Sequence, residues 1–71
     1  MIGDRLRKAR ILKNKTQEEC AIACGVARAG YNHYETGQRR IPYENLAKVC
    51  VFLNISSDYI LGIIDEMRPI F

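Results

Sequence analysis

Three cysteines and one histidine are the residues of this 71-residue chain whose chemistry would suit a metal ion or a nucleophilic reaction. Cys20 and Cys24 are four residues apart, so a helix would place both on one face, with His33 as a possible fourth ligand. Zinc sites, however, usually show tighter ligand pairs such as C-x-x-C, and the sequence has none. Cys20, Cys24 and Cys50 also stand among apolar residues, as core thiols do in a reducing compartment. We therefore expect core cysteines, with no metal and no cofactor.

The sequence also lacks the residue combinations of an enzyme. His33 is its only histidine, and there are no paired carboxylates, no Gly-rich phosphate loop and no nucleophile motif. A chain of this length has little room for a small-molecule pocket. We expect no catalytic residues and a protein that is not an enzyme.

Charge is unevenly distributed along the chain. Residues 1–40 contain nine Lys and Arg against four Asp and Glu, a net charge of +5. Residues 41–71 contain two against four, a net charge of −2. The basic part is a candidate surface for a polyanion. Charge alone leaves an ordinary solvated surface as an equal alternative.

Hydropathy predicts a chain without membrane segments. No run approaches the roughly 18 uncharged apolar residues that a membrane span requires. The N-terminus carries charges from Asp4 to Lys8 with no apolar run behind them, which is unlike a signal peptide. We expect a cytoplasmic chain with no membrane partner.

The periodicity of apolar residues predicts helices along almost the whole chain and no strands. A chain of this length has room for one domain with a modest core. Thr16 and Glu19 form a T-x-x-E capping box, and Gly25 is a typical helix end. Pro42 suits the first turn of a helix, where its missing N–H costs nothing. The expected helices cover residues 3–13, 17–24, 28–35, 42–53 and 58–61.

The second and third helices have the spacing of a helix-turn-helix, two short helices joined by a tight glycine turn. This geometry lets the second helix of the pair lie in the major groove of DNA while the first crosses the backbone. Ala21 is small enough for the helix crossing, and Gly25 permits the sharp turn.

An ordered set of short motifs extends this pattern over about residues 2–62. The motifs are Thr16-Gln17-Glu18-Glu19, Ala21, Gly25-Val26, the run YETGQRR from Tyr34 to Arg40, Pro42, Leu46, Asn54-Ile55-Ser56 and the run DYILG from Asp58 to Gly62. With these motifs the chain closely resembles the Cro/CI-like (Xre-type) helix-turn-helix family. The resemblance implies an all-α, compact five-helix, lambda-repressor-like domain over residues 1–62, followed by an apolar tail over residues 63–71. It also implies that the chain binds double-stranded DNA as a transcriptional regulator, with a repressor as the leading interpretation.

The resemblance assigns the reading of bases to the third helix. Arg28 would pair with O6 and N7 of guanine, a contact worth roughly 1–3 kcal/mol of discrimination. Ala29 would touch a thymine methyl, Asn32 would read adenine, and His33 would contact a base or a phosphate. For Arg28 the alternative is a phosphate contact or a solvated charge, and for His33 it is an exposed side chain without a function.

The resemblance assigns phosphate contacts to residues on either side of this helix. Gln17 would bind a phosphate from the start of the second helix, with a plain surface residue as the alternative. The other expected phosphate contacts follow the recognition helix and are Thr36, Gln38, Arg39 and Arg40. Glu35 is expected to be structural, with Arg10 as its partner, because a carboxylate would repel phosphate.

Three residues depart from the family pattern, and one of them is Thr36, which replaces the Asn that is frequent before Gly37. Ala27 stands where Ser or Thr usually caps the recognition helix, and loss of such a cap costs about 1 kcal/mol. Gly30 lies inside the helix and costs roughly another 1 kcal/mol relative to Ala. We expect a recognition helix of low stability, together with either modest sequence specificity or a domain that binds a protein instead.

The C-terminal part has more apolar residues than a small monomer should expose. These candidate dimerisation residues are Ile60, Ile63, Ile64, Met67, Ile70 and Phe71. We expect a homodimer that binds a palindromic operator. One alternative is a tail that folds back on its own core. The other is an antitoxin or protein-interaction module, in which the tail would bind a protein partner.

Overall fold

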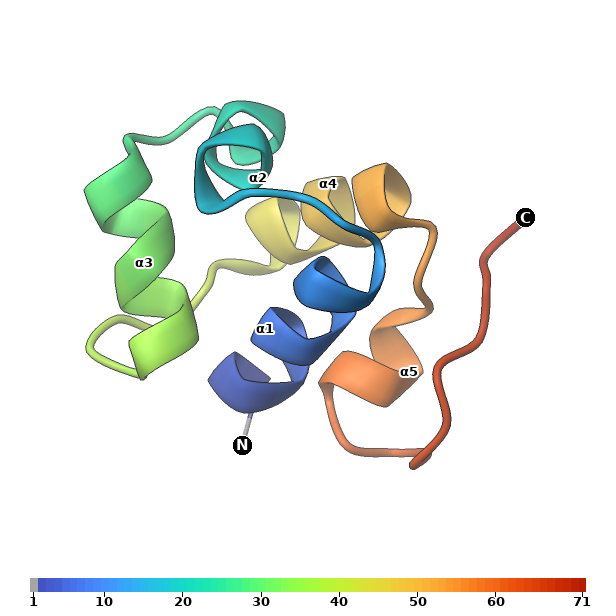
Figure 1. Ribbon diagram of the computed structural model, residues 1–71. Coiled ribbons are helices and arrows are strands. Elements are labelled where there is room, and N and C mark those ends of the chain that lie inside the picture. The colour runs from blue at the N-terminus through green and yellow to red at the C-terminus, as the bar shows by residue number, and fades with distance from the viewer. Residues whose placement is uncertain (1) are drawn as a thin grey trace.

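The computed structural model describes residues 2–71, which form five helices and no strand (Figure 1). The helices are α1 (Ile2–Leu12), α2 (Gln17–Cys24), α3 (Arg28–Thr36), α4 (Tyr43–Leu53) and α5 (Ser57–Ile60). The predicted all-helical class is confirmed, and each predicted helix end lies within one residue of the observed one. None of these helices is long and apolar enough to cross a bilayer.

Local side chains account for the helix ends. At the start of α2, the Thr16 hydroxyl accepts from the Glu19 main-chain N–H at 3.0 Å, and the Glu19 carboxylate accepts from the Thr16 N–H at 2.8 Å. The predicted capping box is therefore present. Gly25 ends α2 in the left-handed conformation, with φ 73°. Pro42 precedes α4 as its N-cap, because its extended ψ of 152° places it before the first helical turn rather than in it.

The core draws large side chains from each of the five helices. The largest fully buried ones are Tyr31, Leu6, Ile60, Val49 and Cys20. Close packing of α1 on α3 depends on Gly3, because a Cβ there would collide with the main-chain carbonyl of Glu35. The absence of a side chain at Gly3 therefore lets α1 lie directly against the main chain of α3.

All three cysteines are buried and unpaired, as the sequence predicts. Burial raises the pKa of Cys24 and of Cys50 to about 11. Burial also raises the pKa of Cys20. The thiols are therefore protonated at neutral pH and pack as small apolar groups.

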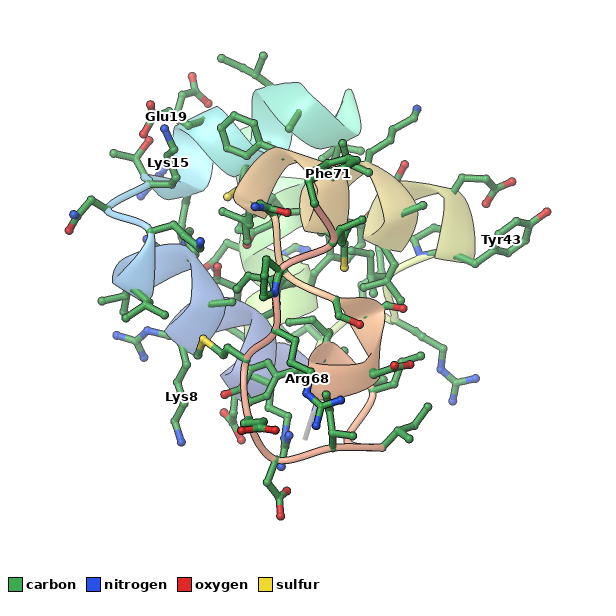
Figure 2. The ribbon with its side chains drawn as sticks, turned by 90° about the vertical axis from the view of Figure 1, so that its right-hand side faces the viewer. Lys8, Lys15, Glu19, Tyr43, Arg68 and Phe71 are labelled. Carbon is green, nitrogen blue, oxygen red and sulfur yellow. The ribbon has the colours of Figure 1, made fainter. Side chains whose placement is uncertain are left out.

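Residues 63–71 contain no helix and return along α5 to the end of α4 (Figures 1 and 2). The Ser56 N–H donates to the Arg68 carbonyl at 2.7 Å. The main-chain N–H groups of Ile70 and Phe71 both donate to Asn54 Oδ1, at 2.9 and 3.0 Å. The tail is thus attached to the domain at several points.

Arg5 of α1 makes a further attachment. Its Nη1 donates to the carbonyls of Tyr59 and Ile64, at 3.0 and 2.8 Å. Its Nη2 lies 2.8 Å from the Asp65 carboxylate, and its guanidinium stacks 4.7 Å from the centre of the Tyr59 ring. Arg5 therefore joins α1 to both α5 and the tail.

The expected dimerisation residues fall into different environments. Ile60 is only 1% exposed and belongs to the core, which corrects the prediction that it offers surface to a partner. Ile64 and Met67 are half-buried and pack against the core. Ile63 is 69% and Phe71 82% exposed, and Ile70 is also exposed. Only the last three leave free apolar surface.

Candidate nucleic-acid interface

α3 lies at the edge of the domain, on the side opposite the C-terminal tail (Figure 1). It buries Tyr31, Tyr34 and Glu35 against the core, so its opposite face is open. The turn before it is fixed by Gly25 and by a hydrogen bond from the Val26 N–H to the Ala21 carbonyl at 3.0 Å. α2 and α3 therefore form the predicted helix-turn-helix.

The residues predicted to read bases lie on the uncovered side of α3. Arg28 and Ala29 in its first turn are exposed. Asn32 and His33, one turn later, are half-buried. The structure thus places all four on the side of α3 that faces away from the core, where α2 reaches Asn32 through Gln17.

The residues predicted to contact phosphates lie at the C-terminal end of α3. Thr36 is the last residue of the helix, and the others follow in a turn. Thr36, Gln38, Arg39 and Arg40 are all exposed. The Thr36 hydroxyl donates to the His33 carbonyl at 3.3 Å and accepts from the Gln38 N–H at 3.4 Å. Cationic side chains therefore lie at both ends of the open face of α3, Arg28 at one end and the Arg39-Arg40 pair at the other.

The start of α3 has the two departures that the sequence indicates. Ala27 is its N-cap and makes no side-chain capping bond. A Cβ built on Gly30 would have only Val26 Cβ near it, at 4.0 Å, so packing does not require glycine there. The helix is formed nonetheless over its full nine residues.

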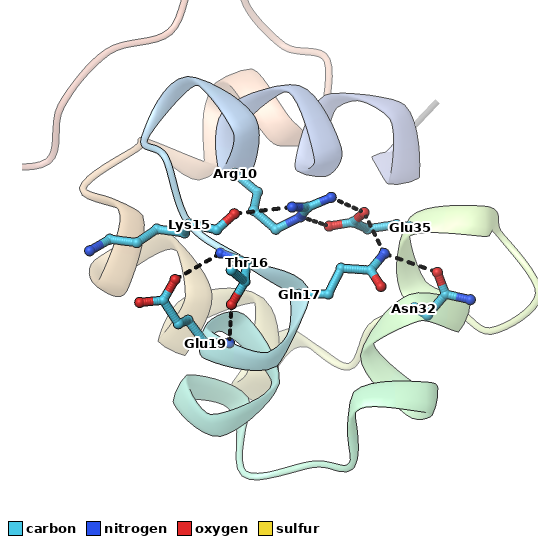
Figure 3. A network of polar contacts seen from close by, with 7 residues as sticks. All are labelled: Arg10, Lys15, Thr16, Gln17, Glu19, Asn32 and Glu35. Carbon is cyan, nitrogen blue, oxygen red and sulfur yellow. Dashed lines mark hydrogen bonds and ion pairs between the residues drawn. The ribbon is translucent and has the colours of Figure 1, made fainter.

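A polar network behind α3 joins four residues from three helices (Figure 3). We call Arg10, Glu35, Gln17 and Asn32 the polar network. Arg10 Nε donates to Glu35 Oε2 at 2.7 Å, and its Nη2 donates to Glu35 Oε1 at 3.1 Å. Arg10 Nη1 also donates to the Lys15 carbonyl at 3.0 Å. The predicted pairing of Arg10 with Glu35 is confirmed.

The ion pair controls the charge of Glu35. Burial of this side chain, which is only 2% exposed, would raise the pKa of Glu35. The hydrogen bonds that it accepts, above all from Arg10, outweigh burial and lower the pKa. The same hydrogen bond raises the pKa of Arg10. Both groups are therefore ionised at neutral pH.

Gln17 connects the ion pair to the open face of α3. Its Nε2 donates to Glu35 Oε1 at 3.1 Å and to Asn32 Oδ1 at 2.9 Å. The sequence indicates Gln17 and Asn32 only as separate contact residues and gives no sign that they bond to each other. Their separation of 15 residues belongs to no local pattern. The one sign of such a network in the sequence is the structural role expected for Glu35, because a buried carboxylate needs hydrogen-bond donors around it.

A different surface lies between α2 and α4. It is a shallow apolar hollow lined by Ala23, Ala47, Lys48, Val51 and Phe52. Lys15 Nζ lies 5.3 Å from the centre of the ring of Phe52, one of the residues that line this hollow. Its mainly apolar lining is unlike a phosphate site. No group of three or more His, Cys, Asp or Glu within residues 2–71 is arranged to hold a metal ion.

Comparison with known proteins gives a consistent set of relatives. The sequence matches the family described as helix-turn-helix over residues 6–60. It is 36% identical over 61 residues to the SPbeta prophage-derived uncharacterized HTH-type transcriptional regulator YonR of Bacillus subtilis, covering 86% of this chain and 56% of that protein. It is 33% identical over 69 residues to the HTH-type transcriptional regulator YobD of the same organism, covering 97% and 62%.

A third relative comes from a different organism. The cryptic phage CTXphi transcriptional repressor RstR of Vibrio cholerae is 38% identical over 61 residues, which cover 86% of this chain and 54% of the repressor. The chain thus spans little more than half the length of the curated relatives it matches.

Proposed function

Because this chain belongs to the Cro/CI-like helix-turn-helix family, we propose that it binds double-stranded DNA through α3 and regulates transcription, as a repressor. The observation that supports this most is the open face of α3, with Arg28 at one end and Arg39 and Arg40 beyond the other. Recognition helices of this class enter the major groove with their N-terminal residues at the base edges. In that pose Arg28 and Ala29 meet bases, while Arg39 and Arg40 meet phosphates.

The start of α2 supplies the remaining phosphate contact. Both N–H groups of the Gln17 side chain donate inward, to Asn32 and Glu35. The main-chain N–H groups of the first helical turn have no partner within their helix and lie at its positive end. We propose that Gln17 contacts phosphate through its main-chain N–H, with its side chain holding α2 against α3.

Selection of bound sequences from a random DNA pool tests the proposed function. The unaltered chain is expected to enrich one sequence, and Arg28→Ala is expected to lose the preference at a guanine, a discrimination of roughly 1–3 kcal/mol. Lys48→Ala, on α4, is the matched control and should enrich the same sequence with an unchanged preference. No enrichment by the unaltered chain, together with bulk DNA affinity that does not depend on salt, would contradict the proposal and favour the protein-interaction alternative.

We further propose that the chain acts as a homodimer on a palindromic operator. Ile63, Ile70 and Phe71 leave exposed apolar surface on the tail. The tail lies opposite α3, so a two-fold contact between tails leaves both recognition helices free (Figures 1 and 2). Two-fold symmetry would then be matched by inverted half-sites in the DNA.

Sedimentation velocity tests the dimer. The unaltered chain should sediment as a dimer, and the double variant Ile63→Asp/Phe71→Asp as a monomer. Ile11→Asp is the control, because Ile11 is a comparably exposed apolar residue on α1. A monomer for all three chains at high concentration would contradict this proposal without bearing on DNA binding by α3.

A further inference from the structure

The direction of hydrogen bonding in the polar network is fixed by charge. A primary amide has two N–H donors on its nitrogen and only acceptors on its oxygen, and an ionised carboxylate only accepts. Arg10 lies against Glu35 and keeps it ionised, so the Gln17 atom that faces Glu35 must be Nε2. With one N–H on Glu35 and the other on Asn32, both donors of Gln17 are used.

The orientation of the Gln17 amide in turn determines the orientation of the Asn32 amide. Since Gln17 Nε2 donates, the Asn32 atom that faces it at 2.9 Å must be the acceptor Oδ1. Asn32 Nδ2 then points away from Gln17 (Figure 3). No hydrogen bond from this nitrogen to any part of residues 2–71 is present, and it lies on the side of α3 that carries Arg28. The free end of the Asn32 amide is therefore its donor end.

We infer that Asn32 is a specificity residue that contacts DNA only as a hydrogen-bond donor, with its orientation set by Arg10, Glu35 and Gln17. This inference rests on the proposed function. A donor recognises O6 or N7 of guanine, O4 of thymine, N7 of adenine, or a phosphate oxygen. Reading adenine requires the oxygen and the nitrogen of one amide together, at N6 and N7. Asn32 Oδ1 is directed at Gln17, so the adenine contact that the family resemblance implies is replaced by a contact to an acceptor.

Asn32→Asp is the sharpest test, because it exchanges the donor for an acceptor in the same shape. The carboxylate can still accept from Gln17, but its second oxygen now faces the DNA. In selection from a random pool, the unaltered chain should prefer guanine or thymine at the position that depends on Asn32, above adenine, whose N7 acceptor stands beside a donating amino group. The aspartate variant should lose that preference by about fivefold or more and favour cytosine or adenine, whose amino groups donate. Gln38→Glu makes the same change of charge nearby and should weaken binding without altering any base preference.

The phosphate alternative gives a different pattern. If the acceptor is a phosphate oxygen, Asn32→Ala and Asn32→Asp should weaken binding to all sequences by one common factor. Base preferences should then stay as in the unaltered chain, and this outcome would overturn the assignment of Asn32 as a specificity residue. An adenine preference at the Asn32-dependent position that is lost when the N6 amino group of that adenine is removed would overturn the inference, because N6 donates and would need the Asn32 oxygen. An aspartate variant that binds as tightly as the unaltered chain would also overturn it. Failure of the unaltered chain to enrich any sequence, together with a bulk DNA affinity that does not depend on salt, would instead overturn the proposed function, and with it the role of Asn32 on DNA.

Gln17→Ala tests the control of Asn32 by the network. Without Gln17, the Asn32 amide can rotate and offer both its oxygen and its nitrogen, so adenine should gain about fivefold or more at a base-contact position. A DNA-free measurement decides the orientation separately. In the free chain, the side-chain NH₂ of Gln17 should be protected from proton exchange with water, and that of Asn32 should not. Protection of the Asn32 NH₂ with an unprotected Gln17 NH₂ would show the opposite orientation and overturn the inference.

Discussion

The Arg10 guanidinium donates to both carboxylate oxygens of Glu35, at 2.7 and 3.1 Å, and so joins the first helix to the third on the side away from the open face of α3. Only 13% of the Arg10 side chain and 2% of the Glu35 side chain are exposed. A pair this well buried contributes through the cost of leaving either charge alone rather than through attraction in water. This pair also anchors the orientation of Gln17 and Asn32.

Removal of one partner of this pair should be strongly destabilising. Arg10→Met keeps most of the side-chain volume but leaves the Glu35 carboxylate buried without a counter-charge. The free energy of unfolding in urea should fall by about 3–5 kcal/mol. The double variant Arg10→Met/Glu35→Leu removes both charges and should regain a large part of that loss. A single variant as stable as the unaltered chain would contradict the structural role of the pair.

Acid should destabilise the domain through Glu35. Its folded-state pKa lies below the ordinary value of 4.5, so the carboxylate contributes stability at neutral pH. That contribution is lost as the pH falls below 4.5 and through the folded-state pKa. The exposed Glu19, with a pKa lowered mainly by its hydrogen bond to the Thr16 main chain, acts in the same direction. Urea unfolding at neutral and acid pH should show a smaller acid loss for Glu35→Gln than for the unaltered chain, and equal losses would contradict this assignment.

Gly30→Ala should stabilise the protein. The added methyl meets nothing closer than Val26 Cβ at 4.0 Å, and alanine is favoured over glycine inside a helix by about 0.5–1 kcal/mol. Thermal unfolding should therefore shift upward. The same substitution at Gly3, also helical, should instead be clearly destabilising because its Cβ would strike the Glu35 carbonyl. Destabilisation by Gly30→Ala would mean that the glycine is needed for packing.

Arg5 should hold the tail to the domain. Arg5→Met removes the hydrogen bonds to the carbonyls of Tyr59 and Ile64 and should cost about 2 kcal/mol of unfolding free energy. The Ser56 N–H, which donates to Arg68 in the tail, should exchange faster with water. Asp65→Asn is the control and should change stability by less than about 0.5 kcal/mol, because Asp65 is 95% exposed. Unchanged exchange at Ser56 in the Arg5 variant would show that the tail is held by other contacts.

The fold was predictable because local signals agree with one another along the chain. The capping box at Thr16 and Glu19, the left-handed Gly25 and the spacing of apolar residues each mark the observed helices. The place of Arg28 at the start of the third helix was expected from the family resemblance. Local signals of this kind act within one turn of helix and are readable from neighbouring residues.

Contacts between distant segments were less accessible from the sequence. The Gln17 side chain is divided between Asn32 and Glu35, and no periodicity reports a bond across 15 residues. Ile60 is apolar like the tail residues, so the sequence suggests that it belongs to the same exposed patch. In the structure, α5 directs its side chain into the core. The return of the tail along Asn54 depends on two main-chain N–H groups, which every sequence contains and which therefore leave no signal in residue types.

Backbone chemical-shift mapping during titration with the selected DNA duplex tests the central claim most directly. The account predicts that the largest shifts fall on α3, on the following turn at residues 37–40 and on the first turn of α2. Shifts at the apolar hollow beside Val51 and Phe52 should be small. Large shifts confined to that hollow or to the tail, with α3 unchanged, would contradict DNA recognition by this helix.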